Sequence, residues 1–213
     1  MIEFPQSAAF GERITLAKLK RQGLGASLVS LVKEVTWAYK LAPSTVSLAS
    51  TASVREVEVF DLRLKTAGEK LRKWAEVVSG LNAIVRNPFV VRIFSEDGEF
   101  IESAIVPKES NGALFGDSVI YRMAHSADDI GLPSGVTNLE TLLIGLSAAL
   151  AGMSARSGEG LRGFIERHYR VESLRGELAE TERKLAKETQ LARKYELAKE
   201  VRRLQKEVAK TAA

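Results

Sequence analysis

The stretch VREVEVFDLRLK, residues 54–65, carries the strongest strand signal in the chain. Apolar and often β-branched residues alternate with charged residues along it, which is the pattern of a strand with one buried face. The alternation changes phase at Val59 and Phe60, so we expect a β-bulge or burial on both faces there. The chain is therefore expected to contain a β-sheet built around this stretch.

Further strand signals follow downstream. Two apolar runs, residues 84–94 and 100–106, predict a β-hairpin, because the residues between them include Asp97 and Gly98, which favour a tight turn. Residues 117–123, DSVIYRM, are expected to add another strand. Together these segments predict a small, mostly antiparallel sheet.

Helices are predicted around these strands. Thr137 and Glu140 have the spacing of a capping box, and Gly152 closes the almost wholly apolar helix that follows them. Upstream, a second helix is expected to end at Pro43, because apolar residues recur there at helical spacing, namely Leu28, Leu31, Val32, Val35 and Tyr39. Strands that include a hairpin, flanked by helices, predict an α+β fold.

Length and composition fit one such domain with a helical appendage. The chain has 213 residues, of which 45% are hydrophobic and 27% are charged, as in ordinary folded proteins. We assign residues 1–154 to the α+β domain and residues 155–170 to a glycine-containing link with a short helix. Residues 171–213 are assigned to a long charged helix of coiled-coil type, so the fold is expected to end in a long C-terminal helix.

The segment 171–213 contains two apolar stripes that are out of phase. On one continuous helix they would lie about 130° apart around the axis. Either the helix bends back between residues 188 and 196, or its two halves face different neighbours; the absence of Gly and Pro after Gly176 favours a continuous helix. A helix of this length needs something to pack against, so a homodimer or a protein partner is expected. The stripes are Val171, Leu174, Leu178, Thr181 and Leu185, and then Leu197, Val201, Leu204 and Val208.

Composition excludes several classes of function. The chain has no Cys, which rules out disulfides, thiolate zinc sites and thiol nucleophiles. Charged residues near the N-terminus and the lack of an apolar segment of bilayer length predict a cytoplasmic protein without membrane contact. No cofactor and no metal site is predicted.

The positive charge of the chain lies in its tail. Residues 155–213 hold 15 Lys or Arg against 10 Glu, which permits contact with nucleic acid.

Two motifs suggest chemistry without its usual context. Residues 158–163, GEGLRG, match the dinucleotide pattern GxGxxG, but they follow a helix and precede more helix, so a flexible link is expected instead. Glu56 and Glu58 share one face of the predicted strand. Asp61 with Arg63 and Lys65 resembles the acidic, x, basic pattern of metal-dependent nucleases, but that pattern needs a further acidic residue on a neighbouring strand and normally Lys in the third position. A solvated strand face is the favoured alternative.

Trp37 is a candidate for binding. On the predicted helix it lies opposite the apolar stripe, with Lys33 four residues before it and Lys40 three residues after it. An aromatic ring between two lysines can stack on a nucleobase or contact an acidic partner. The favoured alternative is that Trp37 packs beneath the N-terminal segment around Phe4 and Phe10.

Several short segments together resemble an uncharacterised prokaryotic family that is classed as a domain of unknown function. Members of that family are often encoded beside helicases and DNA methyltransferases of restriction-like or anti-phage loci. The resemblance implies an accessory role in such an assembly and singles out tail residues for binding. The matching residues are Phe4 and Pro5, WAYKLAP at 37–43, EVFDLRLK at 58–65, and Glu188, Gln190, Arg193, Glu196 and Leu197.

Three hypotheses for function follow. The first is a non-enzymatic interaction protein that dimerises or docks onto a partner through residues 171–213, in the DNA-processing defence system that the resemblance implies. The second is a nucleic-acid-binding subunit that uses Trp37, Lys33, Lys40 and the basic tail. The third and weakest is a metal-dependent nuclease built on Glu58, Asp61 and Lys65.

Overall fold

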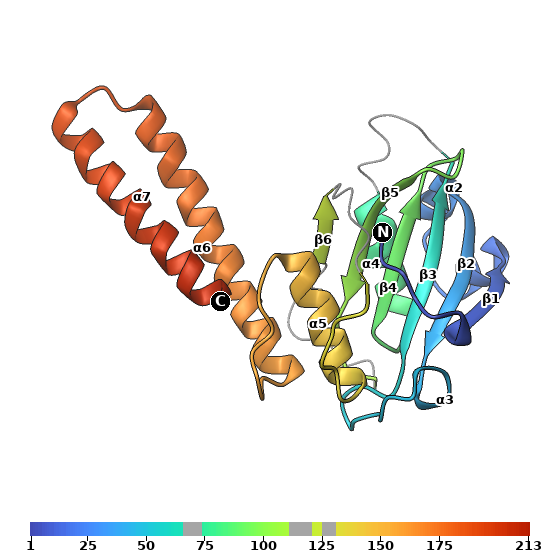
Figure 1. Cartoon of the computed structure of the whole chain (residues 1–213). Coiled ribbons are helices and arrows are strands. Elements are labelled where there is room, and N and C mark those ends of the chain that lie inside the picture. Colours follow the sequence, from blue (N-terminus) through green and yellow to red (C-terminus); the bar gives the residue numbers. More distant parts are fainter. Residues whose placement is uncertain (66–73, 111–120, 125–130) are drawn as a thin grey trace. The chain divides into compact units, whose positions relative to one another are not determined.

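The computed structural model describes residues 1–65, 74–110, 121–124 and 131–213 of the chain. It separates into two compact units, which are unit 1, Met1–Ala151, and unit 2, Gly152–Ala213. Unit 1 contains a β-sheet with helices packed on it, and unit 2 contains two long helices (Figure 1). The predicted α+β fold with a mostly antiparallel sheet and a helical C-terminal region is confirmed.

In the described part of unit 1, the sheet has six strands in the order β1-β2-β3-β4-β5-β6. All neighbouring strands are antiparallel except β3 and β4, which are parallel and are joined through α4. In chain order the elements are η1 (Gln6–Ala8), β1 (Ala9–Ile14), α1 (Leu16–Arg21), α2 (Ala26–Leu31), β2 (Val32–Leu41), α3 (Pro43–Val46), β3 (Val57–Leu64), α4 (Trp74–Ile84), β4 (Phe89–Phe94), β5 (Phe100–Val106), β6 (Tyr121–Ala124) and α5 (Leu139–Ala151).

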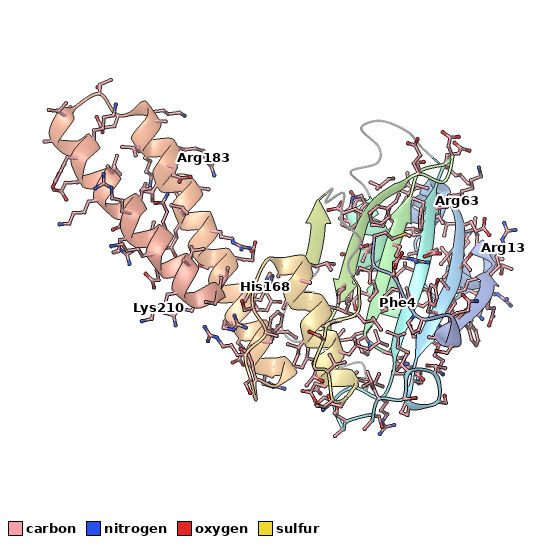
Figure 2. All side chains as sticks on the ribbon, viewed as in Figure 1. Phe4, Arg13, Arg63, His168, Arg183 and Lys210 are labelled. Carbon is pink, nitrogen blue, oxygen red and sulfur yellow. The ribbon has the colours of Figure 1, made fainter. Side chains whose placement is uncertain are left out.

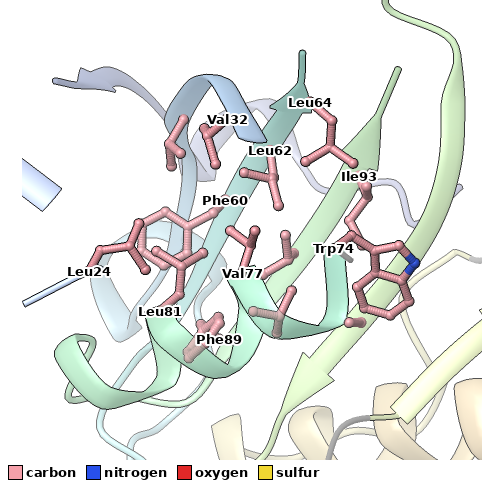
Figure 3. Close-up of a cluster of buried hydrophobic side chains, with 14 of the residues drawn as sticks. Leu24, Val32, Phe60, Leu62, Leu64, Trp74, Val77, Leu81, Phe89 and Ile93 are labelled. Atoms are coloured by element: carbon pink, nitrogen blue, oxygen red, sulfur yellow. The ribbon is translucent and has the colours of Figure 1, made fainter. Parts of the chain in front are cut away.

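One face of the sheet is covered by α4 together with α1 and α2. The core between them is made of aliphatic and aromatic side chains, and Figure 3 shows ten of them by name: Leu24, Val32, Phe60, Leu62, Leu64, Trp74, Val77, Leu81, Phe89 and Ile93. Alternate residues of β3 contribute Phe60, Leu62 and Leu64 to this face, as expected for a strand. Helix α5 contacts β5 and β6.

The helix predicted from Leu28 to Pro43 is wrong after its first turn, because α2 ends at Leu31 and Val32–Leu41 is strand β2. Its buried residues are Val32, Val35, Ala38 and Leu41, which recur every third position. The pairing of β2 with β3 shifts after Val32 and again after Trp37. Each irregularity shifts the alternation by one residue, and Leu41 is buried on the other face of the sheet, opposite Val57. Burial at every third residue therefore imitates the spacing of a helix. The β-branched and aromatic residues here were the better signal.

Other predicted elements agree with the structure. The strand within residues 54–65 is β3, and the hairpin is formed by β4 and β5. The strand expected at residues 117–123 overlaps β6, and residues 117–120 lie outside the described residues. The predicted capping box is displaced by one residue, because Thr141 N donates to Asn138 Oδ1 at 2.9 Å and Asn138 N donates to Thr141 Oγ1 at 3.1 Å. An Asn is as good an N-cap as a Thr.

Unit 2 is an antiparallel helical hairpin of α6 (Leu161–Lys187) and α7 (Leu191–Ala212). Of the two interpretations of residues 171–213, the bend is confirmed and the favoured continuous helix is wrong. Helix α6 also includes the residues assigned to a short separate helix. The chain bends back at residues 188–190, at the start of the range that the phase shift indicated. The two apolar stripes pack on each other, with Leu174 on α6 and Val201 and Leu204 on α7 buried. The apolar side chains of each helix are thus buried against the other helix of the same hairpin.

Glu188 explains how the chain turns here without Gly or Pro. Its backbone N–H donates to Lys184 O at 3.1 Å and so closes the last turn of α6. Its carboxylate Oε1 accepts from the backbone N–H groups of Thr189 and Gln190, both at 2.9 Å, next to the start of α7. The bond from Gln190 is the main reason that the pKa of Glu188 is lowered. The Glu188 side chain thus supplies hydrogen bonds that allow the chain to turn at the end of a helix, where Gly is the usual residue.

Charged side chains cover the outside of the hairpin, as Arg183 on α6 and Lys210 on α7 illustrate in Figure 2. Among the described residues, no helix is both long enough and apolar enough to cross a membrane.

Candidate functional site

Unit 1 contains a cleft of about 650 Å³ that brings together two of the predicted site residues. It lies between β2 and β3 on one side and α1 and the end of α4 on the other. Trp37 and Phe60 form an aromatic wall, and Glu58 and Asn87 provide polar groups. Arg86 also lines this cleft, which we call the Trp37 cleft. A cleft in which an aromatic wall faces convergent polar groups is suited to binding a small molecule.

Glu58 is held in place by the segment that follows α4. Asn87 Nδ2 donates to Glu58 Oε1 at 2.9 Å and to Glu56 Oε1 at 2.6 Å, so the two carboxylates share one face of the chain, as predicted. Lys40 Nζ forms an ion pair with Glu56 Oε2 at 2.7 Å. Burial raises the pKa of Glu58, the bond from Asn87 works against that rise, and the nearby charge of Glu56 adds to it.

A buried lysine lies close to this group. Lys108 Nζ donates to Asn82 O and Asn82 Oδ1, both at 3.0 Å, and to Val85 O. These carbonyls belong to the C-terminal turn of α4, so the ammonium group caps the helix where a positive charge is favoured. Burial lowers the pKa of Lys108 to about 8, although the charge of Glu58 raises it in part.

The structure does not bring the proposed nuclease residues together. Glu58 and Asp61 are three residues apart on a regular strand, so their side chains lie on opposite faces of the sheet. Asp61 accepts two hydrogen bonds from Arg92, at 2.7 and 2.8 Å, and the Arg92 side chain is buried. Lys65 is exposed beyond the end of β3. No cluster of three metal-ligating His, Cys, Asp or Glu residues occurs among the described residues.

Trp37 is partly buried on β2 rather than on a helix. Its ring centre lies 4.5 Å from that of Phe10, as the packing alternative proposed, and 6.1 Å from that of Phe60. Lys40 Nζ lies 5.8 Å from the ring centre of Trp37, whereas Lys33 forms an ion pair with Glu96 at 3.5 Å. Of the two lysines predicted to frame this ring, only Lys40 is close to it.

The GxGxxG segment forms part of a structural clamp at the base of the hairpin. Gly158 has a φ of +73°, and Gly160 is the N-cap of α6. Between them, Glu159 accepts two hydrogen bonds from Arg167, at 2.8 and 2.7 Å, and Arg167 is the main reason that the pKa of Glu159 is lowered. The segment therefore joins the start of α6 to its second turn, and the dinucleotide interpretation has no support.

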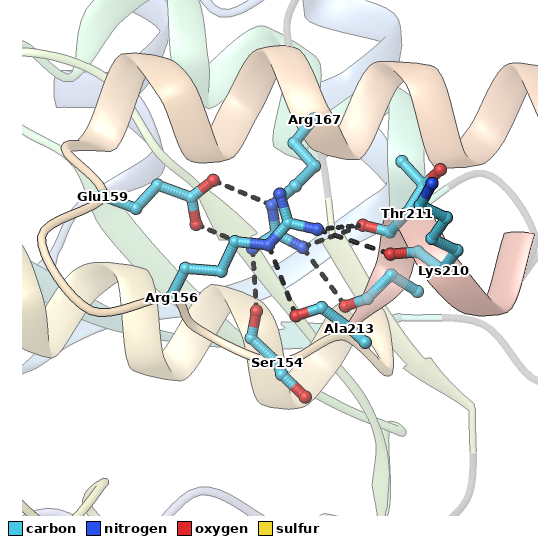
Figure 4. Close-up of polar contacts among 8 residues, drawn as sticks. Ser154, Arg156, Glu159, Arg167, Lys210, Thr211 and Ala213 are labelled. Atoms are coloured by element: carbon cyan, nitrogen blue, oxygen red, sulfur yellow. Dashed lines mark hydrogen bonds and ion pairs between the residues drawn. The ribbon is translucent and has the colours of Figure 1, made fainter.

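Arg167 also binds the end of α7 (Figure 4). It donates to Ser154 O at 2.7 Å, Thr211 O at 3.2 Å and Ala212 O at 3.1 Å. Arg156 adds bonds to carbonyl groups of the same last turn, at 3.2 to 3.5 Å. The last four carbonyl groups of a helix have no partner within it, so these two arginines close α7. We call this group the arginine clamp.

The outer face of α7 is the second candidate site. Leu191, Tyr195, Lys199, Arg202 and Lys206 recur every three or four residues, so they share one side of the helix, opposite the buried seam. Leu191 is 85% exposed and Tyr195 is 71% exposed. These two large apolar side chains therefore lie next to each other in solvent on one side of α7.

The charges of α7 are segregated around the helix. Its acidic residues lie away from the outer face, and Arg203 binds two of them, Glu200 at 2.7 Å and Glu207 at 2.8 Å. Within the described part of the chain, Lys199, Arg202 and Lys206 form no ion pair. The outer face therefore combines two apolar side chains with three uncompensated positive charges.

The predicted binding residues of the tail lie beside this face. Glu188 and Gln190 form the turn, and Arg193 and Glu196 line a surface hollow with Lys184 and Leu197 at the tip of the hairpin. Leu191 and Tyr195 were missed. Their signal in the sequence was that two apolar residues four apart belong to neither of the two apolar stripes.

Asn87, Arg86 and Lys108 of unit 1 were also missed by the sequence analysis, because they come together only through the packing of α4 on the sheet.

The geometry defines an α+β domain followed by a self-packed helical hairpin. The model of a family described as a domain of unknown function (DUF4391) matches residues 2–208. Because the match covers nearly the whole chain, the protein belongs to this family, as the sequence resemblance indicated. No curated protein and no solved structure matches the chain significantly.

Proposed function

We propose that the protein is a non-enzymatic accessory protein that docks onto an acidic protein partner through the outer face of α7. The observation that carries this proposal is the exposure of Leu191 and Tyr195 beside the cations Lys199, Arg202 and Lys206. Apolar anchors, especially Tyr, supply most of the energy of protein interfaces, and peripheral charges direct the approach of the partner. The family resemblance implies that the partner belongs to a DNA-processing or anti-phage assembly.

The seam of the hairpin is not the docking surface in this proposal, because α6 and α7 already cover it. A homodimer through the outer face is also disfavoured. Two copies of this face would bring like charges together, which weakens association. An acidic partner is thus favoured over a second copy of the chain.

Truncating both anchors tests this proposal. A photo-crosslinking residue at Ala192 of the full-length chain identifies the partner in cells, and the affinity of the purified pair is then measured. Replacing Leu191 and Tyr195 by Ala is expected to weaken binding by about 30-fold or more, since each anchor accounts for about 1–2 kcal/mol. Tyr169→Ala on α6 is the matched control, because Tyr169 is 40% exposed but lies on the other helix. Unchanged affinity in the double variant would contradict the proposal.

A second candidate function is nucleic-acid binding, which the three uncompensated cations favour. Replacing Lys199, Arg202 and Lys206 by Gln would then weaken binding to DNA or RNA and would lower the slope of log affinity against log salt by about 2–3. The matched control replaces Arg183, Lys184 and Lys187 of α6 by Gln. If the wild type binds neither DNA nor RNA in a salt-dependent manner, a protein partner is supported instead.

A further inference from the structure

The Trp37 cleft has the dimensions and walls of a site for one small planar molecule. Its volume of about 650 Å³ lies within the usual range for small-molecule pockets, which is about 300–1,000 Å³. The indole of Trp37 is fixed before any ligand arrives, because Nε1–H donates to Tyr39 O at 3.0 Å and Phe10 packs against the ring. A rigid aromatic wall favours a flat, aromatic ligand.

The polar end of the cleft is suited to amino and amide groups. Glu58 is partly buried, and Asn87 fixes its carboxyl group through the bond to Oε1 at 2.9 Å. Carboxylate side chains accept hydrogen bonds from the exocyclic amino groups of nucleobases, and enzymes that bind single bases combine such contacts with aromatic walls. This end of the cleft therefore matches the hydrogen-bonding edge of a base.

The rim of the cleft carries positive charge. Arg86 is exposed there, and its guanidinium group makes no hydrogen bond or ion pair with the described residues. Lys18 also lines the cleft, and its ion pair with Glu12 is long, at 3.7 Å. An uncommitted guanidinium group is well suited to a phosphate, because its planar donors match two phosphate oxygens.

We infer that the Trp37 cleft binds a nucleotide. The base lies against Trp37 and Phe60 with its polar edge at Glu58, and the phosphate lies at Arg86. The nucleotide is either free or the end of a nucleic-acid strand, because both present the same base and phosphate. This inference concerns unit 1 and does not depend on the docking function proposed for α7.

Calorimetric titration of the full-length protein tests this inference. The probes are the four common nucleoside monophosphates, the corresponding nucleosides, and trinucleotides that carry the same 5′-terminal nucleotide. At least one monophosphate is expected to bind with a Kd on the order of 10–100 µM, as usual for ligands of this size. A trinucleotide that binds more tightly than the monophosphate identifies a strand end as the ligand, and equal affinity identifies the free nucleotide.

Two variants assign the ends of the ligand. Arg86→Gln is expected to lower the affinity for the monophosphate about tenfold and to leave the affinity for the nucleoside unchanged. Glu58→Gln is expected to lower both affinities. Arg21→Gln, an exposed change on α1 outside the cleft, is the control and should leave binding unchanged. Because Arg86 and Arg21 are exposed, neither change endangers folding. Absence of binding at millimolar concentrations, or equal binding by the Arg86 and Arg21 variants, would overturn the inference.

Discussion

Replacing Arg167 by Met is expected to destabilise the helical hairpin by about 3–5 kcal/mol. The side chain of Arg167 is only 6% exposed, and its five N–H donors are all used by Glu159, Ser154 and the end of α7. Removing them leaves the carboxylate of Glu159, which is 12% exposed, without its counter-charge. It also leaves carbonyl groups of α7 without donors, and each such loss is costly.

Hydrogen–deuterium exchange of the full-length protein measures this effect. Amides of α7 are expected to exchange much faster in the Arg167→Met variant, while those of β3 and β4 in unit 1 stay protected. Arg170→Met is the matched control, because Arg170 is 70% exposed and its ion pair with Glu207 is long, at 3.7 Å. Exposed pairs contribute little, so this variant should resemble the wild type. Equal exchange in the two variants would show that the arginine clamp does not hold the hairpin together.

Replacing Lys108 by Met is expected to destabilise unit 1 by about 2 kcal/mol. The methionine fills the space but offers no donor to Asn82 O and Val85 O, so the end of α4 loses its cap. The cost of burying the ammonium group offsets part of the stabilisation, which limits the expected loss. Chemical denaturation measures it, with Lys20→Met on α1 as an exposed lysine control. A stability equal to that of the Lys20 variant would contradict the capping role.

The same lysine gives unit 1 a distinctive pH dependence. Its pKa is about 8 in the folded state against 10.5 for an ordinary lysine. Between pH 8 and pH 10.5 the unfolded chain holds a proton on Lys108 that the folded chain has lost. The free energy of unfolding therefore increases as the pH is raised from 8 to 10.5, and this increase is absent below pH 8. The full difference is roughly 3 kcal/mol. Unfolding of the wild type and of Lys108→Met, compared from neutral pH to above pH 10, measures it, and a parallel pH dependence of the two proteins would refute the assignment.

The sequence predicted well those elements whose signal is local. The strand β3 and the hairpin of β4 and β5 are marked by alternation and by the Asp97–Gly98 turn. Strand β2 was mistaken for a helix because two bulges and burial on both faces of the sheet place its buried residues three apart. Such bulges depend on the pairing with β3, which no local pattern contains.

The Trp37 cleft could be predicted only in part. Trp37 and Glu58 were singled out by residue type, but their proximity depends on the pairing of Trp37 with Phe60 across β2 and β3. Asn87 and Arg86 complete the cleft from the end of α4, and their spacing in sequence from Glu58 gives no sign of this. The expected grouping of Glu58 with Asp61 failed for a simple reason, which is that residues three apart on a strand point to opposite faces.

In the tail, a correct observation left two interpretations open, and the absence of Gly and Pro favoured the wrong one. The two apolar stripes are out of phase on one straight helix, and the bend at Glu188 resolves the conflict by letting them face each other. Since Glu188 caps the turn with its side chain, the absence of Gly and Pro did not indicate continuity. The surface left for a partner is then the outer face of α7.

The most direct test of this account is a distance measurement between residues 170 and 207. The chain has no Cys, so Arg170→Cys and Glu207→Cys introduce two unique sites for spin labels. In the hairpin these residues are neighbours, since Arg170 Nη2 and Glu207 Oε1 are 3.7 Å apart, whereas on a continuous helix they would be about 55 Å apart. Pulsed electron spin resonance on labelled protein diluted with unlabelled protein is expected to give the short distance within one chain. A distance near that of the continuous helix would contradict the hairpin and the docking surface that it presents.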